Sequence, residues 1–407
     1  MSKLQNWTWV PLAIAMTITL AAIGYTLNEG EHQSASDLGL PNVRYRIHFL
    51  QLPTNAEPGH TSINDISNAG EVVGLYTSGR GISAFLYAPT RDAARTIDLN
   101  ELAVGGIPEG AWLRAGIAIN EWGVVVGSLQ LADGDIHPFA LDLGVETPVV
   151  DLLPHCGARQ AYAVQINEHG DIVVQIDDPP SAYVLNPGLY NGDPAVRASR
   201  NGVPQDLSKQ TPQLLPADIS SGPLQLNNPH GDRPAQIAGV TNDHVAFRYT
   251  TGKTPTLETF PTLQISKARS HVEGLNDAGM FCGQYFNTAI DDSYERRLFR
   301  YDRSLELLPG TVSDPISDFN SSGDLITREY FYRDDWGFVH VTDLVVGSDA
   351  DVATWKSGIP FLYAMSDREN QTDAPTLVGE LEGVTIEDET SMPRLLFVLT
   401  PELLPEQ

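Results

Sequence analysis

Residues 117–129 read IAINEWGVVVGSL, and residues 164–176 read VQINEHGDIVVQI, so the same pattern returns after 47 residues. Each stretch holds an N-x-x-G tetrapeptide followed by a short run rich in Val and Ile. An Asn side chain closes a turn by accepting hydrogen bonds from backbone N–H groups further on, and Gly readily adopts a positive φ. Because β-branched residues favour strands, the pattern predicts a β-hairpin.

The hairpin pattern occurs six times, with spacings of 53, 47, 61, 48 and 44 residues between neighbouring glycines. An Asn, or in the first copy a Ser, stands three residues before each glycine. The glycines are Gly70, Gly123, Gly170, Gly231, Gly279 and Gly323, and the turn residues are Ser67, Asn120, Asn167, Asn228, Asn276 and Asn320.

Each copy also carries further apolar runs, which brings the expected count to four short strands per unit. In the first copy these runs are residues 71–76, 84–89 and 96–99, after the strand that enters the turn, and in the sixth copy the run after the turn is residues 324–330. A unit of roughly 50 residues with four antiparallel strands is typical of a β-propeller blade. A β-sandwich is the main alternative, but it needs no such period. The predicted fold class is therefore all-β, a β-propeller preceded by one hydrophobic N-terminal helix.

The number of blades depends on how the two ends of the repeat region are used. Residues 359–365, 376–380 and 395–400 supply strands for one blade beyond the sixth glycine, and residues 45–52 form a lone strand ahead of the first. Pairing the first and last strands would remove exposed sheet edges. We therefore expect seven blades, with six as the alternative.

These units resemble the HAF repeats of exported bacterial proteins, in which an I-N-x-x-G-x-V-V-G segment precedes His-Ala-Phe-Leu and a short Asp-Leu strand. The resemblance covers residues 43–400 and is best in residues 63–87 and 117–141. The chain departs from the family where Ser83-Ala84-Phe85 replaces His-Ala-Phe, and where Asp232 to Pro234 replace the strand after Gly231. The resemblance implies an exported, propeller-like repeat protein and brings no catalytic residues.

The first 28 residues have the features of a targeting segment. Residues 10–27 are a nearly unbroken apolar run of the length expected for an export signal or a membrane anchor, and Lys3 precedes it. We predict a signal peptide or anchor at 1–28, a polar linker at 29–42, the repeat domain at 43–402 with a loop insertion at 186–221, and a tail at 403–407. The expected location is periplasmic, extracellular, or on the outer side of the cytoplasmic membrane.

The composition excludes some partners. With 25 Lys plus Arg against 52 Asp plus Glu, the formal charge is −27, so nucleic acid is not an expected partner. The only expected membrane contact is through the N-terminal segment, if it is uncleaved. The low Lys content and high acidity suggest the hypothesis of a salty habitat.

Residues 318–329 match the spacing of a calcium loop, with candidate oxygen ligands at Asp318, Asn320, Ser322 and Glu329 and a glycine at position 6. The same residues are in register with the hairpin turn of the other units, which explains Asn320 and Gly323 without a metal. We therefore assign no metal, cofactor or catalytic residue, and keep calcium as an alternative. Whether Cys156 and Cys282 pair in a disulfide also stays open.

The sequence thus favours a non-enzymatic binding or scaffold module at the cell envelope, with an unknown protein or glycan ligand. The first alternative is a carbohydrate-active hydrolase or lyase that uses carboxylates on one face. The second is a calcium-stabilised structural protein. If the protein were such an enzyme, its candidate catalytic carboxylates would include the adjacent pairs Asp177-Asp178, Asp291-Asp292 and Asp334-Asp335.

Overall fold

The fold was analysed in a computed structural model of the whole chain. The structure describes residues 43–89, 95–103, 105–143, 149–153, 160–177, 180–185, 213–215, 224–228, 234–241, 245–252, 254–260, 269–287, 295–302, 304–309, 314–367, 374–383 and 394–403. The expected export segment and linker lie outside these residues. None of the helices within the described ranges has the length and apolar character needed to cross a bilayer.

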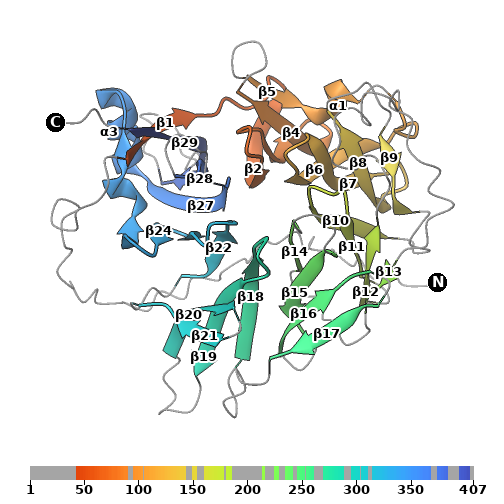
Figure 1. Cartoon of the computed structure of the whole chain (residues 1–407). Helices are drawn as coiled ribbons and strands as arrows, with labels where there is room; N and C mark the ends of the chain where they lie inside the picture. The colour runs from red at the N-terminus through yellow and green to blue at the C-terminus, as the bar shows by residue number, and fades with distance from the viewer. Residues whose placement is uncertain are drawn as a thin grey trace, which may run out of the picture. The chain divides into compact units, whose positions relative to one another are not determined.

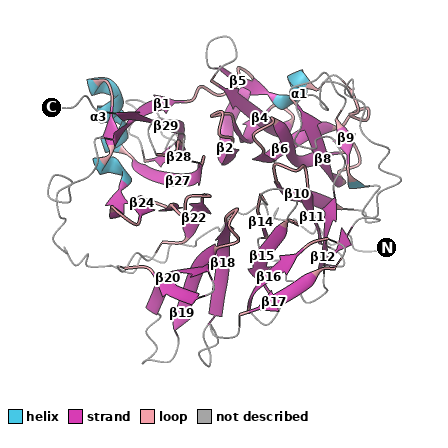
Figure 2. Ribbon diagram, viewed as in Figure 1, coloured by secondary structure: helices cyan, strands magenta, loops and turns pink. Residues whose placement is uncertain are grey.

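Seven β-sheets are arranged around a common centre, as Figure 1 shows, and the chain forms a seven-bladed β-propeller. Six of the sheets take four strands each in chain order, and every strand pair within them is antiparallel. Figure 2 shows how strongly strands outweigh helices. The predictions of an all-β propeller and of seven rather than six blades are confirmed.

The strands of blades 1 to 6 follow one another along the chain. Blade 1 holds β2 (Ala56–Ile66), β3 (Val72–Ser78), β4 (Gly81–Ala88) and β5 (Arg95–Asp98), followed by the short helix α1 (Leu99–Leu102). Blade 2 holds β6 (Trp112–Ile119), β7 (Val124–Gln130), β8 (Ile136–Asp142) and β9 (Val150–Asp151). Blade 3 holds β10 (Ala161–Ile166), β11 (Ile172–Asp177), β12 (Pro180–Leu185) and β13 (Gln213–Leu214). Blade 4 holds β14 (Gln225–Leu226), β15 (Gln236–Val240), β16 (Ala246–Thr250) and β17 (Thr256–Thr259). Blade 5 holds β18 (Arg269–Leu275), β19 (Phe281–Asn287), β20 (Glu295–Asp302) and β21 (Ser304–Leu307). Blade 6 holds β22 (Ile316–Phe319), β23 (Leu325–Thr327), β24 (Tyr330–Arg333) and β25 (Gly337–His340).

Blade 7 joins the two ends of the propeller. Its order is β26-β1-β29-β28-β27, with β1 (Val43–Phe49) antiparallel to β29 (Leu395–Leu403) and parallel to β26 (Val345–Val346). The remaining strands are β27 (Ile359–Met365) and β28 (Leu377–Glu382). The 3-10 helix η4 (Val341–Asp343) and helix α3 (Asp349–Ser357) flank β26 in the chain. The predicted sharing of one blade by the first and last strands is confirmed.

Hydrophobic clusters lie between neighbouring blades, and each of the seven interfaces has its own. Between blades 1 and 2, Val73 and Leu86 pack with Leu113 and Val125, all of them fully buried. Between blades 7 and 1, Val378 packs with blade 1 residues such as Ile63 and Phe85. Because each sheet buries both faces against its neighbours, no blade holds a complete core alone.

Glycines of the second strands face aromatic rings on the third strands. Gly127 pairs with Phe139 across β7 and β8, and a Cβ added at Gly127 would lie 1.9 Å from the carbonyl oxygen of Ala115 on the first strand. The same pairing joins Gly74 to Phe85 in blade 1. The V-V-G and A-F parts of the repeat are therefore two halves of one packing contact.

The structure differs from two of the sequence-based predictions, one for a strand and one for a loop. Residues 324–330 were expected to form one strand in unit six, but β23 ends at Thr327 and β24 begins at Tyr330. Arg328 and Glu329 form the tight turn between these two strands, and the N–H of Val341, directly after β25, donates to the carbonyl oxygen of Glu329 at 2.9 Å. The expected insertion at 186–221 also contributes β13, the outer strand of blade 3. The rest of that insertion lies outside the described residues.

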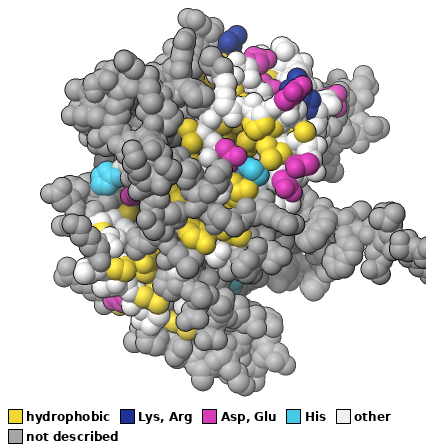
Figure 3. Space-filling model, turned by 90° about the vertical axis from the view of Figure 1, so that its right-hand side faces the viewer, with side chains coloured by type: hydrophobic (Ala, Val, Ile, Leu, Met, Phe, Trp, Pro, Cys, Tyr) yellow, Lys and Arg dark blue, Asp and Glu magenta, His cyan; other side chains and the backbone are white. Residues whose placement is uncertain are grey.

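The side of the molecule turned toward the viewer in Figure 3 carries acidic side chains beside basic ones in its upper part, with hydrophobic side chains between them. On the outer strands β17 and β21 every residue is exposed, including Leu257, Leu305 and Leu307. Glu258 on β17 pairs with Arg248 at 2.7 Å, and Glu306 on β21 pairs with Arg300 at 3.0 Å. Charged pairs therefore accompany the exposed leucines on these edges.

Candidate functional site

The predicted hairpin turns gather at one end of the propeller, which we call the turn end. Five of their glycines adopt a positive φ, between 75° and 86°. In each of these turns the glycine N–H donates to the carbonyl of the turn residue, as Gly123 does to Asn120 at 3.0 Å. The Asn120 side chain accepts from the N–H groups of Trp122 and Val124. The hairpin prediction is therefore confirmed in detail for the five glycines Gly70, Gly123, Gly170, Gly279 and Gly323.

In blade 4 the turn residue is Asn227 and not Asn228, which corrects the sequence-based alignment. The Asn227 N–H donates to the carbonyl of Gln236 at 3.1 Å, and the Gln236 N–H donates to Asn227 Oδ1 at 2.7 Å. In the other copies this pair is four residues apart, as in Asn120 and Val124. Counting back from Gly231 failed because the residues paired across this turn are nine positions apart and not four. Gly231 itself lies outside the described residues.

The turn residues also bridge neighbouring blades. Asn120 Nδ2 donates to the carbonyl oxygen of Asn167 at 3.1 Å, and Asn167 Nδ2 donates in the same way to Asn227 at 3.1 Å. The Asn227 amide reaches the carbonyl of Asn276 at 3.4 Å. Ser67 in blade 1 lacks an amide and keeps only the bond within its own turn, to the Glu71 N–H at 3.2 Å.

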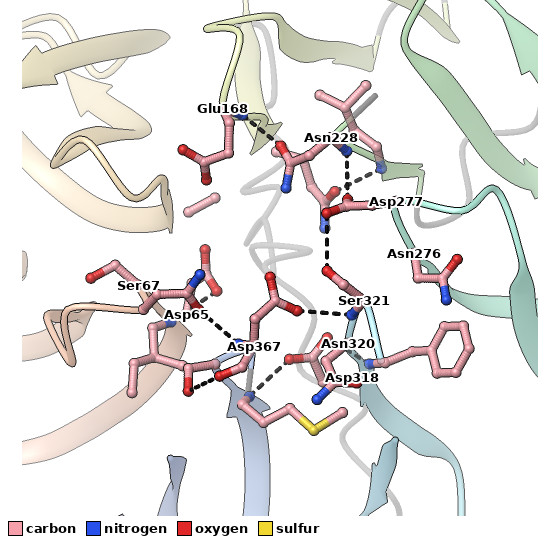
Figure 4. A pocket seen from close by; sticks show the side chains of 18 of the residues that line it. Asp65, Ser67, Glu168, Asn228, Asn276, Asp277, Asp318, Asn320, Ser321 and Asp367 are labelled. Atoms are coloured by element: carbon pink, nitrogen blue, oxygen red, sulfur yellow. Dashed lines mark hydrogen bonds between the residues drawn. The ribbon is translucent and has the colours of Figure 1, made fainter. Parts of the chain in front are cut away.

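In blade 7 the turn residue is Ser366, whose N–H donates to the Thr376 carbonyl at 3.0 Å and whose Oγ accepts from the Thr376 N–H at 2.9 Å. The residue after each turn residue points toward the centre of the turn end, where it forms what we call the turn-end ring. Its members are Asn68, Glu121, Glu168, Asn228, Asp277, Ser321 and Asp367, one from each blade in order. Figure 4 shows several of these side chains converging on the middle of the propeller.

The first half of the turn-end ring is built from backbone N–H groups that donate to the side chain of the next blade. The Glu121 N–H donates to both carboxylate oxygens of Glu168 at 3.0 Å. The Glu168 N–H donates to Asn228 Oδ1 at 2.5 Å, and the Asn228 N–H donates to Asp277 Oδ1 at 2.8 Å. Blades 2, 3, 4 and 5 are thus linked in sequence.

The second half closes the ring. Ser321 Oγ donates to Asp277 Oδ2 at 2.9 Å, and the Ser321 N–H donates to Asp367 Oδ1 at 2.8 Å. The Asp367 N–H donates to Asn68 Oδ1 at 2.7 Å, and Asn68 Nδ2 donates to Glu121 Oε1. The chain of hydrogen bonds therefore returns to blade 2 after passing through all seven blades.

A second layer of blade-to-blade bonds lies two residues before the turn residue. Asp65 in blade 1 accepts through Oδ2 from the Ile119 N–H of blade 2 at 2.9 Å. Asp318 in blade 6 accepts through Oδ2 from the Met365 N–H of blade 7 at 2.8 Å. The other oxygen of each carboxyl accepts from the next N–H of its own strand. The two aspartates therefore make the same pair of contacts at equivalent positions.

In blade 3 a neutral side chain fills this position. Gln165 Oε1 accepts from the Leu226 N–H of blade 4 at 2.7 Å, and Gln165 Nε2 donates to Gln225 Oε1 at 3.0 Å. The bond to the next blade therefore does not require a charge, because an amide oxygen makes it equally well.

These two layers surround a polar cavity of about 150 Å³ on the axis of the propeller. Its lining carries carboxyl groups from six of the seven blades and includes no Lys, Arg or His. The carboxyl groups are those of Asp65, Glu121, Glu168, Asp277, Asp318 and Asp367.

The cavity shifts the titration of its carboxyl groups. Burial raises the pKa of Glu168 to about 8 and that of Asp65 to about 7, and the neighbouring carboxylates add to both shifts. Burial likewise raises the pKa of Asp318 to about 6, with Asp367 as the charge beside it. Burial also raises the pKa of Glu121, although the Asn68 amide opposes the shift. In each of these carboxyl groups the loss of water outweighs the hydrogen-bond donors that stabilise the ionised form.

The candidate ligands of the calcium motif at 318–329 have separate partners in the fold. Asp318 belongs to the cavity, while Asn320 Oδ1 accepts from the Ser322 and Asp324 N–H groups of its turn. Glu329 lies 3.2 Å from His340 Nε2, which lowers the pKa of the glutamate. Among the described residues, no three His, Cys, Asp or Glu side chains are grouped so that they could hold a metal ion.

The other candidates from the sequence lie elsewhere. Cys282 is a free, fully buried thiol in the cluster between blades 5 and 6, and Cys156 lies outside the described residues. Asp334 and Asp335 are exposed at the hairpin of β24 and β25, where they pair with Arg300 at 2.8 Å and Arg333 at 3.2 Å. The carboxyl groups of the 177–178 and 291–292 pairs are not among the described side chains.

Sequence reasoning missed the turn-end ring, although a signal was present. Every position that follows a turn residue is polar, and four of the seven are acidic. No role was assigned to those positions, because only closure of the ring brings blades so far apart in sequence around one cavity.

Comparison with protein families and with curated proteins finds no match for the chain. Several solved structures are similar at low identity. AofleA from Arthrobotrys oligospora has 13% identity and a TM-score of 0.32, over 65% of this chain and 76% of that one. YCF48 bound to D1 peptide has 13% identity and a TM-score of 0.44, over 88% and 95%. The α-L-arabinanase of Penicillium chrysogenum, complexed with arabinobiose, has 10% identity and a TM-score of 0.38, over 88% and 97%. At these values the likenesses carry no functional argument.

Proposed function

We propose that the chain is a non-enzymatic binding or scaffold module that works outside the cytoplasm and presents the turn end of the propeller to its ligand. The supporting observation is that carboxyl groups of the cavity accept hydrogen bonds from the backbone of neighbouring blades. Glu168 holds the Glu121 N–H, and Asp367 holds the Ser321 N–H. Carboxyl groups used in this way maintain the shape of a rigid polar surface.

The chemistry of that surface suggests the kind of ligand. The residues that line the cavity offer mainly hydrogen-bond acceptors and no cationic side chain. A ligand that donates hydrogen bonds, such as a polyhydroxylated or amino sugar or the basic side chain of a protein, complements this lining. The export of the chain is proposed from the apolar run at residues 10–27 and from the resemblance to HAF repeats, which stays a prediction.

A second candidate function is a glycoside hydrolase, and one observation favours it. Burial raises the pKa of Glu168 to about 8, and the Glu121 and Asp277 carboxylates lie near enough to add to that shift. A protonated carboxylic acid beside an ionised carboxylate is the pair that glycoside hydrolases use.

A panel of neutral, acidic and amino-sugar polysaccharides separates the two proposals. A binding module gives saturable binding in calorimetry and releases no new reducing ends on prolonged incubation. Asp367→Asn weakens that binding because it alters the acceptors of the cavity. Glu101→Gln leaves binding unchanged because this exposed residue of α1 lies outside the cavity.

New reducing ends would overturn the binding proposal and support the hydrolase. In that case Glu168→Gln abolishes product formation and keeps binding, because the amide retains an acceptor for the Glu121 N–H and cannot supply a proton. If the chain binds no polysaccharide, a protein remains as the ligand that the binding proposal allows. Retention of a partner by the wild-type protein but not by Asp367→Asn, in a pull-down from the envelope fraction, would then be its remaining support.

A further inference from the structure

Blades 1 and 2, and blades 6 and 7, are joined at the cavity by equivalent contacts. In each pair an aspartate two residues before the turn residue accepts from a backbone N–H of the next blade, at 2.9 Å for Asp65 and 2.8 Å for Asp318. Blades 3 and 4 have the same joint with Gln165 in place of the aspartate, at 2.7 Å. The fold therefore contains two titratable joints and one neutral joint of matching geometry.

The surroundings of the two aspartates raise the free energy of their ionised forms. Asp65 and Asp318 both line the cavity, where the charge of Asp318 acts on Asp65 and the charge of Asp367 acts on Asp318. Asp65 also lies within electrostatic range of Glu168. Glu121 and Asp277 complete the carboxyl groups around Glu168. The lining holds no basic side chain to offset these charges. A carboxyl that loses its proton here gains charge among like charges, in a place with little water.

We propose that the joints made by Asp65 and Asp318 are pH-sensitive: they open more readily as the pH rises toward neutral, whereas the Gln165 joint does not respond. Opening separates the first strands of adjacent blades at the turn end and exposes the aspartate to water. This inference concerns the fold alone and holds for either proposed function.

The direction follows from proton linkage. Burial holds the pKa of Asp65 at about 7 in the closed joint, compared with 3.8 for the exposed group. Between these values the closed state binds the proton more tightly than the open state, so each rise in pH favours opening. The limit is about a tenfold change in the opening equilibrium per pH unit for one proton. For Asp318 the window runs from 3.8 to about 6, and above the raised value neither joint changes further.

Amide hydrogen exchange on the full-length wild-type chain tests the proposal, provided that the exchange is resolved to single residues. The readout is the protection of three N–H groups between pH 5 and pH 7, corrected for the intrinsic exchange rate. Ile119 reports on the Asp65 joint, Met365 on the Asp318 joint and Leu226 on the Gln165 joint. We expect Ile119 to lose protection throughout the range by up to about tenfold per pH unit, Met365 to lose it mainly below pH 6, and Leu226 to stay level.

The variant Asp65→Asn copies the neutral joint that Gln165 already forms. It is expected to abolish the pH response of Ile119 and to leave that of Met365 in place. If the three N–H groups respond alike in the wild type, or if Asp65→Asn leaves the response of Ile119 unchanged, the proposal is wrong. Should the variant fail to fold, the wild-type comparison of Ile119 with Leu226 still decides, because Leu226 is a control within the same molecule.

Discussion

At the scale of single residues, the fold depends on glycines that leave room for another part of the chain. Gly127 lacks space for a side chain because the Ala115 carbonyl oxygen and the Phe139 ring close over it. Gly134 lies in an exposed turn with a φ of 94°, and a Cβ there would contact nothing within 4 Å. The two glycines are needed for different reasons, one for space and the other for backbone conformation.

We expect Gly127→Ala to lower the free energy of unfolding by about 2–3 kcal/mol, since backbone must move to admit the methyl group. Gly134→Ala is the control, with a loss of about 1–2 kcal/mol from its left-handed backbone alone. Chemical denaturation measures both. Equal losses at the two positions would argue against the packing of Gly127 against the first strand.

At the scale of elements, the hairpin turn is also the joint between blades. Asn120 is buried, and its side chain satisfies the N–H groups of Trp122 and Val124 while it donates to the carbonyl of Asn167. A buried side chain with partners in two blades couples the turn to the interface.

Asn120→Ala is therefore expected to destabilise the protein by about 2–4 kcal/mol, because buried donors and an acceptor lose their partner. Asn120→Ser is expected to cost about half as much, since Ser67 shows that a hydroxyl can close the turn without reaching the next blade. Thermal and urea unfolding test this order. A serine variant as unstable as the alanine variant would show that the bond to Asn167 adds most of the stability.

The same elements show how far the sequence could lead. The turn, the strand after it and the period were readable because each has a local cause in Asn, Gly and β-branched residues. The turn of blade 4 was misplaced by one residue, because Asn227 closes onto Gln236 across a longer loop. The split between β23 and β24 was missed because no Gly, Pro or Asn marks the turn at Arg328 and Glu329. The cavity was beyond local reasoning, since its walls meet only when the propeller closes.

At the scale of the whole molecule, the formal charge of −27 acts against compaction. Acidic groups line the cavity, and others lie exposed, such as Glu258 and Glu306 on the outer strands. We expect the melting temperature to rise between low salt and about 1 M NaCl, where the Debye length falls to about 3 Å. Indifference to salt would count against the hypothesis of a salty habitat.

Closure of the propeller by its two ends is the central claim at this scale, and a designed disulfide tests it most directly. Arg46 on β1 and Thr400 on β29 are paired, exposed residues of antiparallel strands, and the Cα atoms of such a pair are close enough to be bridged. The control combines Arg46→Cys with Thr256→Cys, which places the second thiol on the exposed outer strand of blade 4. Peptide mapping of the oxidised, full-length protein identifies the bridges. The closed propeller predicts a 46–400 disulfide in nearly every molecule and none between 46 and 256. Absence of the 46–400 bridge, or equal bridging in both variants, would contradict it.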